Sequence, residues 1–549
     1  MSDEHRSCNG RQLKELAAAG LSWLESHYRR VNELNVFPVP DGDTGTNMLL
    51  TMRNANKEIT QLDSTHVGKV AGQIAHGAMM GSRGNSGTIL SQLWLGFART
   101  IGEARELDVE LAVKAFRTAT DTAYRGVQRP VEGTILTVAR EMTEEAEALT
   151  GKVENLVELL EKMVARGWDA VQRTPELLPT LKNAGVVDSG GTGLMYVLEG
   201  MLRHIKGQPT IIEGEADYDE ALEPEHEGGQ YVHPGENFYD VQFVIKGNQL
   251  NVETIKVAIE RMGESAVVVK SDLAVKVHVH VHNPGIPLNY AANIGQITDV
   301  VVENMLEQYE EFLSRRQPEP TATIQQVEAG QIAVIAVTPG PGLASVFQQL
   351  GVAALVNGGQ TNNPSVEEFV KTIEALETDK IIVLPNNKNI ILTAQQVANL
   401  VQDRQIVVIP TRTVPQGISA MFPYQPDGEL DTVAQAMEAA KDNIISGEVT
   451  TAVRDVELDG VDVKEGQIIG LLDGKLRVST DSLEQAVHEL LSYVEDIDDM
   501  EIVTLYYGAD IGEDDAFALV EFLQEIYPDL EFETVLGGQP YYPYILSVE

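Results

Sequence analysis

Two aspartates separated by a single glycine, Asp41 and Asp43, stand in the segment PDGDTGTN. The glycine adds no bulk, so both carboxylates can turn towards one hard cation, and proteins commonly hold Mg²⁺ with one or two carboxylates plus nucleotide phosphates. A solvated turn is the alternative interpretation, because Asp-Gly is a common turn dipeptide. A calcium loop of the EF-hand type fits poorly, since Thr46 stands where that loop needs glycine and Met52 where it needs glutamate.

Four polar, glycine-containing loops each precede a helical pattern of apolar residues. They are DGDTGTN from Asp41, GSRGNSGT from Gly81, VEGT from Val131 and DSGGTG from Asp188. The first amides of a helix are unpaired and carry partial positive charge, so such loops suit phosphate groups. Each loop alone is more often a plain helix entry, but their joint occurrence favours a phosphate site. No Walker A loop is present, and no GxGxxG follows a predicted strand, so a nucleotide site here is of another kind.

Arg83 is the one cation in these loops, which contain no histidine, lysine or cysteine. It could stabilise charge on a transferred phosphoryl group, or it could form a helix-entry salt bridge. The lack of a general base fits a carboxylate acceptor, because a carboxyl group with a reference pKa of about 4 is already ionised at neutral pH. A hydroxyl acceptor would need a base from elsewhere, such as a partner subunit.

The composition indicates an acidic chain that still forms hydrophobic cores. Asp and Glu number 83 against 40 Lys and Arg, the formal net charge is -43, and 43% of residues are hydrophobic. This balance disfavours binding to nucleic acids and anionic membranes, which depends on clustered Lys and Arg. The only cysteine, Cys8, excludes an internal disulfide. Because no signal-peptide pattern and no long apolar run occurs, we expect a soluble cytoplasmic protein.

At 549 residues the chain is long enough for several domains. The patterns predict a multidomain protein with an all-α domain at 1–207, an acidic linker at 208–236, a small α+β domain at 237–314, a second linker at 315–330 and an α/β domain at 331–549. In the α+β domain, YDVQFVI and LAVKVHVHV read as strands around a helix from about Val252, with a further helix near 299–314. In the α/β domain, the strands IAVIAV, KIIVLP and QIVVIP alternate with helices, and Ser365 with Glu368 forms a capping box.

A family resemblance extends over nearly the whole chain. The segments LNVFPVPDGDTGTNM, GSRGNSGTILSQLWLGF, EGTILTVARE and VVDSGGTGLMYVLEG resemble the DhaL-type (DAK2) ATP-binding domain of the dihydroxyacetone kinase family. Further segments, VKVHVHVHNPG, GGQTNNPSVEEF, VLPNNKNIIL and VIPTRTVPQGISA, resemble the longer fatty acid kinase catalytic subunits. The resemblance implies a DhaL-like helical barrel holding ATP and two Mg²⁺ ions, a zinc-containing middle domain, a DegV-like C-terminal domain and a homodimer.

The reaction implied by this resemblance transfers the γ-phosphate of ATP to a fatty-acid carboxylate, giving an acyl phosphate for phospholipid synthesis. The fatty acid would be presented by a separate DegV-like carrier protein. Two alternatives stay open: a small-molecule kinase acting on dihydroxyacetone, and a non-catalytic lipid-binding or scaffold protein with a relict nucleotide fold. The two additional domains argue against a small-molecule kinase, which has no evident use for them.

The resemblance also assigns site residues. Asp41 and Asp43 match the metal-binding aspartates; the acid that precedes this pair in the free-standing dihydroxyacetone kinase is absent, and Asn35 is the nearest candidate for its place. The residues that match phosphate-contacting loops are Thr44, Asn47, Asn85, Ser86 and Gly87, and those that match the last loop near the nucleotide are Asp188 and Ser189.

A zinc site is the corresponding expectation for the middle domain. The alternation of VKVHVHVHN places His278 and His280 on one face of a strand. Where related kinases have a tyrosine followed by a cysteine, this chain has Tyr239 followed by Asp240. Zinc accepts carboxylate oxygen as well as imidazole nitrogen, so Asp240, His278 and His280 could hold it. The histidines could equally line a solvated face of the sheet.

Overall fold

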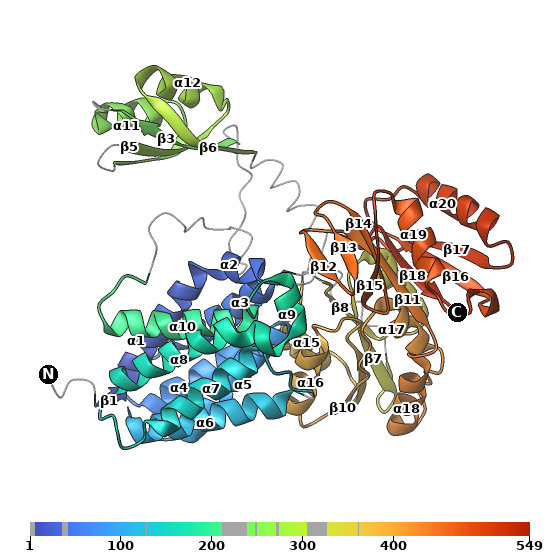
Figure 1. Ribbon diagram of the computed structural model, residues 1–549, viewed down its shortest axis with the longest axis horizontal. Coiled ribbons are helices and arrows are strands. Elements are labelled where there is room, and N and C mark those ends of the chain that lie inside the picture. Colours follow the sequence, from blue (N-terminus) through green and yellow to red (C-terminus); the bar gives the residue numbers. More distant parts are fainter. Residues whose placement is uncertain are drawn as a thin grey trace. The chain divides into compact units, whose positions relative to one another are not determined.

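The computed structural model describes residues 6–35, 42–127, 129–210, 239–247, 250–270, 274–304, 327–360 and 362–549 (Figure 1). The chain forms two compact units: the first combines Met1–Asp217 with Ala322–Glu549, and the second is Tyr218–Thr321. The order of an all-α domain, a small α+β domain and an α/β domain confirms the predicted fold class.

The N-terminal part of the first unit is a helical domain. Its helices are α1 Gly10–Glu25, α2 Tyr28–Glu33, α3 Thr44–Thr60, α4 Val67–Met80, α5 Gly84–Ile101, α6 Val109–Gly126, α7 Ile135–Ala148, α8 Leu156–Leu177, α9 Pro179–Ala184 and α10 Ser189–Ile205. Two short antiparallel strands, β1 Ser7–Asn9 and β2 Glu106–Asp108, add a small sheet that the sequence did not predict. Buried Cys8 pairs with Leu107 in that sheet, which ties the start of the chain to the helices.

Helices α5 and α6 approach closely at Gly96. A Cβ atom at this position would lie 2.5 Å from the carbonyl oxygen of Thr118 and 2.6 Å from the Cα atom of Ala119. Glycine therefore lets the two helix backbones pack in direct contact, because any side chain would push them apart.

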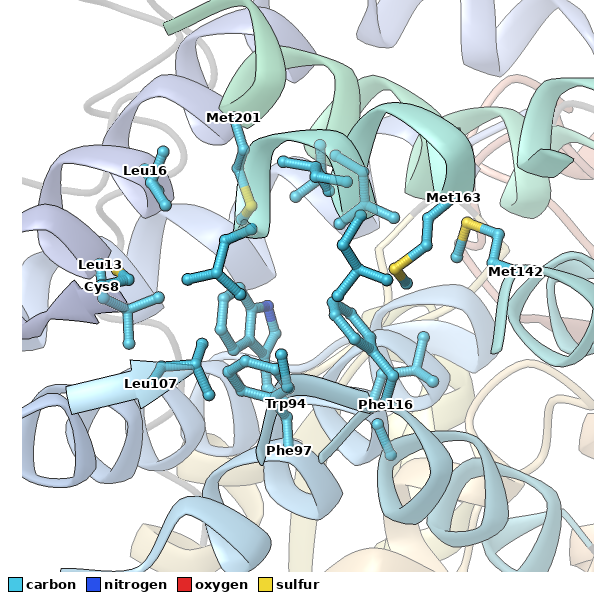
Figure 2. Close-up of a pocket in the computed structure, with 18 of the residues that line it drawn as sticks. Cys8, Leu13, Leu16, Trp94, Phe97, Leu107, Phe116, Met142, Met163 and Met201 are labelled. Carbon is cyan, nitrogen blue, oxygen red and sulfur yellow. The ribbon is translucent and has the colours of Figure 1, made fainter. Parts of the chain in front are cut away.

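An apolar cavity of about 350 Å³ lies inside the helical domain. Figure 2 shows side chains from several helices around it, among them Trp94, Phe116, Met163 and Met201. Its lining is dominated by Leu, Met and aromatic side chains, and none of the predicted site residues contributes to it. The predicted site residues therefore lie outside this cavity.

The second unit contains one antiparallel sheet and two helices in its described part. Its elements are β3 Tyr239–Lys246, α11 Val252–Glu260, β4 Glu264–Lys270, β5 Ala274–Val281, α12 Gly285–Ile294 and β6 Gln296–Asn304, and the strand order is β4-β5-β3-β6. The valines of β5 are buried with Phe243 in one core. The prediction of a helix near 299–314 is wrong for its first part, because the β-branched run Val300–Val302 extends β6 alongside β3. Residues 305–314 lie outside the described part.

The C-terminal domain begins with a parallel sheet of order β10-β9-β7-β8. Its elements are β7 Ile332–Thr338, α14 Pro341–Gln349, β8 Ala354–Asn357, α15 Val366–Glu374, β9 Lys380–Leu384, α16 Ile391–Leu400 and β10 Gln405–Val408. Every residue of β7 is buried, as expected for a strand covered on both faces. The predicted capping box is confirmed, since Ser365 Oγ accepts from the backbone of Glu368 at 3.3 Å and the Glu368 carboxylate accepts from the backbone of Ser365 at 2.5 Å.

The remainder of this domain contains a two-stranded antiparallel sheet, β12-β13, and a larger sheet that the sequence analysis did not separate from the parallel one. The strand order of the larger sheet, β15-β14-β11-β18-β16-β17, is antiparallel except between β16 and β17. The elements after β10 are α17 Val414–Met421, α18 Leu430–Ala440, β11 Ile445–Thr451, β12 Val456–Leu458, β13 Val461–Val463, β14 Ile468–Leu472, β15 Lys475–Thr480, α19 Leu483–Ser492, η3 Ile497–Asp499, β16 Ile502–Tyr507, α20 Glu513–Ile526, β17 Glu531–Leu536 and β18 Tyr544–Val548.

Within the first unit, the helical and C-terminal domains meet through buried polar groups of α5 and α16. The hydroxyls of Thr88 and Thr393 lie 3.1 Å apart, and Gln396 Nε2 donates to Ser91 Oγ at 3.3 Å. Because a buried polar group without a partner is costly, these paired groups fix one docking arrangement of the two helices. In the part of the chain that the structure describes, no helix has both the length and the apolar character needed to span a bilayer.

Candidate phosphate-binding site

The starts of α3 and α10 lie in direct contact. Ser189 Oγ, in the first turn of α10, donates to Asn35 Oδ1 at 3.0 Å and to Thr44 Oγ1 at 3.4 Å. Thr44, the first residue of α3, donates its own hydroxyl to the same Asn35 oxygen at 2.8 Å. The structure thus brings Ser189 together with two predicted site residues, Asn35 and Thr44, that lie about 150 positions earlier in the sequence.

The starts of α7 and α10 are joined by one carboxylate. Asp188, the N-cap of α10, accepts from the backbone N–H of Gly191 at 2.6 Å and also from the backbone of Ile135, the first residue of α7. Desolvation raises the pKa of Asp188 from 3.8 to about 6, and these two backbone hydrogen bonds oppose the rise. Asp188 is therefore a structural clamp between two helix starts as well as a predicted nucleotide contact.

The start of α5 packs against α3 through glycines of the GSRGNSGT loop. Gly84 has a φ of +55°, in the left-handed region that favours glycine, and a Cβ there would lie 2.7 Å from Asn47 Nδ2. A Cβ on Gly87 would lie 2.5 Å from Thr51 Oγ1. The first turn of α5, which includes Asn85 and Ser86, thus lies against α3 and lines the same cavity as the starts of α7 and α10.

Asp43 stands at the N-cap position of α3, but its side chain does not cap the helix. Asn32 does so instead, since its Oδ1 accepts from the backbone N–H of Gly45 at 2.7 Å and of Thr46 at 3.2 Å. The Asp43 carboxylate accepts from Asn363 Nδ2, in the C-terminal domain, at 2.5 Å. Because Asn32 satisfies the helix, the Asp43 carboxylate is directed to groups outside it. Asp41 lies outside the described residues, so its pairing with Asp43 around a cation stays a prediction.

Arg83 contacts the C-terminal domain. Its guanidinium donates to the carbonyl oxygen of Asn363 at 3.2 Å and lies 3.4 Å from the carboxylate of Glu368. This ion pair joins Arg83 to another domain rather than to the helix that follows, and a role of Arg83 in stabilising a transferred phosphoryl group stays a prediction. Sequence reasoning missed Asn363 and Glu368, because their role depends on how the two domains dock.

A cavity of about 830 Å³ lies between the helix starts and the C-terminal domain. The helical domain contributes Asn85, Ser86, Ile89, Val127, Arg129, Val131, Thr134, Ile135, Leu136, Asp188, Ser189 and Gly190, and the C-terminal domain contributes Lys388, Ile391, Leu392, Gln395, Pro410, Arg412, Gln416, Glu438, Lys441 and Asp442. The first wall holds helix-start amides and hydroxyls, and the second holds three cations, Lys388, Arg412 and Lys441, together with two acids, Glu438 and Asp442. The arrangement suits an anion that carries an apolar group, because both walls also offer aliphatic side chains.

The metal predictions remain open. Among the described residues, no group of three or more His, Cys, Asp or Glu side chains gathers in a way that could hold a metal ion. The side chains of Asp240, His278 and His280 lie outside the described part, although the backbone register sets Asp240 opposite His280. Zinc in the middle domain therefore stays a prediction.

Comparison with known proteins identifies all three domains. The DAK2 domain model matches residues 38–203, the middle domain of FakA-like fatty acid kinases matches 236–312, and the FakA-like C-terminal domain matches 333–549. Protein YloV of Bacillus subtilis (strain 168) is 38% identical over 555 residues, which covers 99% of this chain and 100% of YloV.

Two solved structures are similar to parts of the chain. DegV, a fatty acid binding protein from Bacillus subtilis, is 14% identical with a TM-score of 0.29 and covers 40% of this chain and 98% of its own. The dihydroxyacetone kinase from C. freundii, solved with AMP-PNP and Mg²⁺, is 14% identical with a TM-score of 0.30 and covers 55% of this chain and 57% of its own. On the three matching domain models in their predicted order and the full-length similarity to YloV, the chain belongs to the FakA-like family of fatty acid kinases.

Proposed function

We propose that this protein is an ATP-dependent kinase that transfers the γ-phosphate to a fatty-acid carboxylate held on a DegV-like carrier protein, giving an acyl phosphate. The observation that carries the proposal is the convergence of the starts of α3, α5, α7 and α10, three of which line one large cavity. Together with the DAK2 match over the same helices, this favours a nucleotide phosphate site.

The residues present fit a magnesium nucleotide. The Asp43 carboxylate is not used to cap its own helix, and Asp41 is only two positions away. Bound Mg²⁺ would neutralise negative charge on the β- and γ-phosphates. In the proposal, Asp41 and Asp43 hold the metal ions, with Asn35 beside them, while Thr44, Asn47, Asn85, Ser86 and Gly87 contact phosphate oxygens. Asp188 and Ser189 border the nucleotide.

The residue types that are absent from the four loops indicate which group accepts the γ-phosphate. Phosphoryl transfer depends mainly on positioning and charge neutralisation. The four loops hold no histidine, lysine or cysteine that could remove a proton. A fatty-acid carboxylate needs no such base at neutral pH, since it is already ionised. A separate carrier would keep the acyl chain out of water and present only its carboxylate.

The proposal is tested with the full chain, a DegV-like carrier loaded with oleate, and a coupled assay of ATP consumption. Asp41→Asn and Asp43→Asn should each lower kcat by at least about 100-fold, because each removes charge that the transition state requires. The matched control is Asp63→Asn in the same domain, whose side chain is 86% exposed and which stands outside the four loops. Its activity should equal that of the wild type.

Three results would contradict the proposal. Unchanged turnover in both loop variants would remove the metal role of the aspartates. ATP consumption with dihydroxyacetone and no carrier would indicate a small-molecule kinase. A wild-type protein that binds fatty acid but shows no thermal shift with Mg·ATP would indicate a lipid-binding or scaffold protein. Light scattering on the same sample tests the homodimer that the family resemblance implies.

A further inference from the structure

Cations reach the cavity of about 830 Å³ mainly from the C-terminal domain. Lys388, Arg412 and Lys441 line it from that side, and Arg129 is the cation that lines it from the helical domain. Two acids, Glu438 and Asp442, line the same wall, and Asp442 is paired with Lys441 at 2.7 Å. In a chain with a formal charge of -43, Lys388 and Arg412 together form a local exception that faces the predicted phosphate loops.

Both residues follow strands of the parallel sheet at the same edge. Lys388 lies in the loop after β9, and Arg412 lies in the loop after β10. The carboxyl ends of parallel strands in an open α/β sheet are the usual place for ligands. Here that edge faces the helical domain, since Asn389, next to Lys388, accepts at 3.4 Å from Asn85 Nδ2 in the first turn of α5.

Buried Asn386 holds the two loops as one unit. Asn386 has a φ of 54° and is 6% exposed, and its backbone N–H donates to Thr411 Oγ1 at 3.0 Å. The Thr411 hydroxyl donates back to Asn386 Oδ1 at 2.8 Å, and Asn386 Nδ2 donates to the carbonyl oxygen of Val337 at 2.9 Å. Thr411 immediately precedes Arg412, so this network fixes the backbones that carry both cations. A binding site needs its side chains in fixed positions, whereas a solvated surface does not.

We propose that Lys388 and Arg412 bind the phosphate oxygens of the nucleotide, so that the C-terminal domain completes the phosphate site begun by the helix starts. The inference rests on the proposed kinase function and assigns part of its site to a different domain. The inference also explains why the four loops of the helical domain contain a single cation, Arg83, which is paired with Glu368. The positive charge that phosphoryl groups require comes from across the domain boundary.

The test measures the dissociation constants of a Mg·non-hydrolysable ATP analogue and of adenosine for the full-length protein. Lys388→Ala and Arg412→Ala should each weaken the analogue by about 10- to 100-fold, the range for losing a hydrogen bond to a charged group. Adenosine binding should stay unchanged, because adenosine carries no phosphate. Arg412→Lys should restore part of the loss. The control is Lys475→Ala, an exposed lysine on β15 of the same domain, with both constants at wild-type values.

The outcomes separate this inference from the function on which it rests. If the wild type binds the analogue and both alanine variants bind it equally well, the assignment of Lys388 and Arg412 is wrong while the kinase proposal stands. An unchanged analogue affinity with a raised KM for the loaded carrier would assign the cations to the acceptor and overturn the inference. A loss of adenosine affinity equal to the loss of analogue affinity would overturn the inference, because the effect would then not depend on phosphate. A wild type that binds no analogue would overturn both proposals.

Discussion

Asp188 combines a structural and a predicted binding role in one side chain. It caps α10, accepts from the backbone of Ile135 at the start of α7, and lines the large cavity. Burial raises its pKa from 3.8 to about 6. A carboxyl group whose pKa is raised by folding stabilises the folded state while protonated, and this contribution is lost as the pH rises from about 4 through about 6.

Asp188→Asn should therefore change the pH dependence of stability. Asparagine keeps a side-chain oxygen for the capping bond but does not ionise. Relative to the wild type, the variant should gain stability as the pH rises from 4 to 7, by at most about 3 kcal/mol. Thermal unfolding of both proteins across this pH range measures the difference. A difference in melting temperature that is constant with pH would contradict the raised pKa.

At the residue level, sequence reasoning located one wall of the candidate site. Asn35 and Thr44 were named from one motif and Ser189 from another, and the structure joins the three by hydrogen bonds. Helix starts can be predicted because capping residues and glycines are local signals. Asn363 and Arg412 could not be placed in the same way, because nothing local to their sequence shows which surface of another domain they face.

At the level of elements, two glycines in neighbouring helices differ in the space that their surroundings leave for a side chain. Gly96 in α5 packs directly against α6, whereas a Cβ at Gly72 in α4 would meet nothing within 4 Å. Both lie inside helices with ordinary helical dihedral angles. The two positions therefore form a matched pair in which only the space available to a side chain differs.

Alanine should destabilise the helical domain at one position and stabilise it at the other. Gly96→Ala should cost about 1–3 kcal/mol by overpacking α5 against α6. Gly72→Ala should stabilise by about 0.5–1 kcal/mol, because alanine has the higher helix propensity and loses less backbone entropy. Urea unfolding followed by circular dichroism compares them. Equal effects of the two substitutions would rule out close helix packing as the reason for Gly96.

The strands show where sequence patterns predict elements well and where they do not. The apolar runs that form β7, β9 and β10 were recognised because their hydrophobicity is continuous and flanked by turn residues, although only β7 and β9 are largely buried. The run 299–304 was assigned to a helix, because a short apolar segment fits either structure until its pairing is known. Here, pairing of β6 with β3 decides for a strand.

At the level of the whole molecule, the excess negative charge opposes compactness. The formal charge of -43 implies mutual repulsion over the surface, and salt shortens the screening length from about 10 Å at 0.1 M to about 3 Å at 1 M. Isolated surface ion pairs contribute little to stability. Their weakening by salt should therefore not offset the stability gained when salt screens the repulsion.

The melting temperature at pH 7 should therefore rise between 0.1 M and 1 M NaCl. Differential scanning fluorimetry measures it, with the same pair of salt concentrations at pH 4.5 as the control. Near the sequence pI of about 4.5 the net charge approaches zero, and the rise should nearly vanish. A rise of the same size at both pH values would point to a general salt effect instead of relief of repulsion.

The arrangement of domains is the part of the structure that the sequence could not supply. The helical and C-terminal domains were predicted as separate units, but their docking through Thr88, Thr393 and Gln396 depends on polar groups of ordinary type. Such groups can be recognised as contacts between domains only when both surfaces are known. The candidate site was consequently predicted as a property of one domain, whereas its cavity lies between two.

The buried strand residue Cys8 has a practical consequence. Its side chain is 7% exposed, and burial raises its pKa to about 12, so almost none of it is thiolate at neutral pH. As it is also the only thiol in the chain, the native protein should be nearly inert to maleimides. A cysteine introduced on each side of the domain boundary could thus carry a fluorophore pair without background labelling, and energy transfer would report any opening of that boundary during turnover.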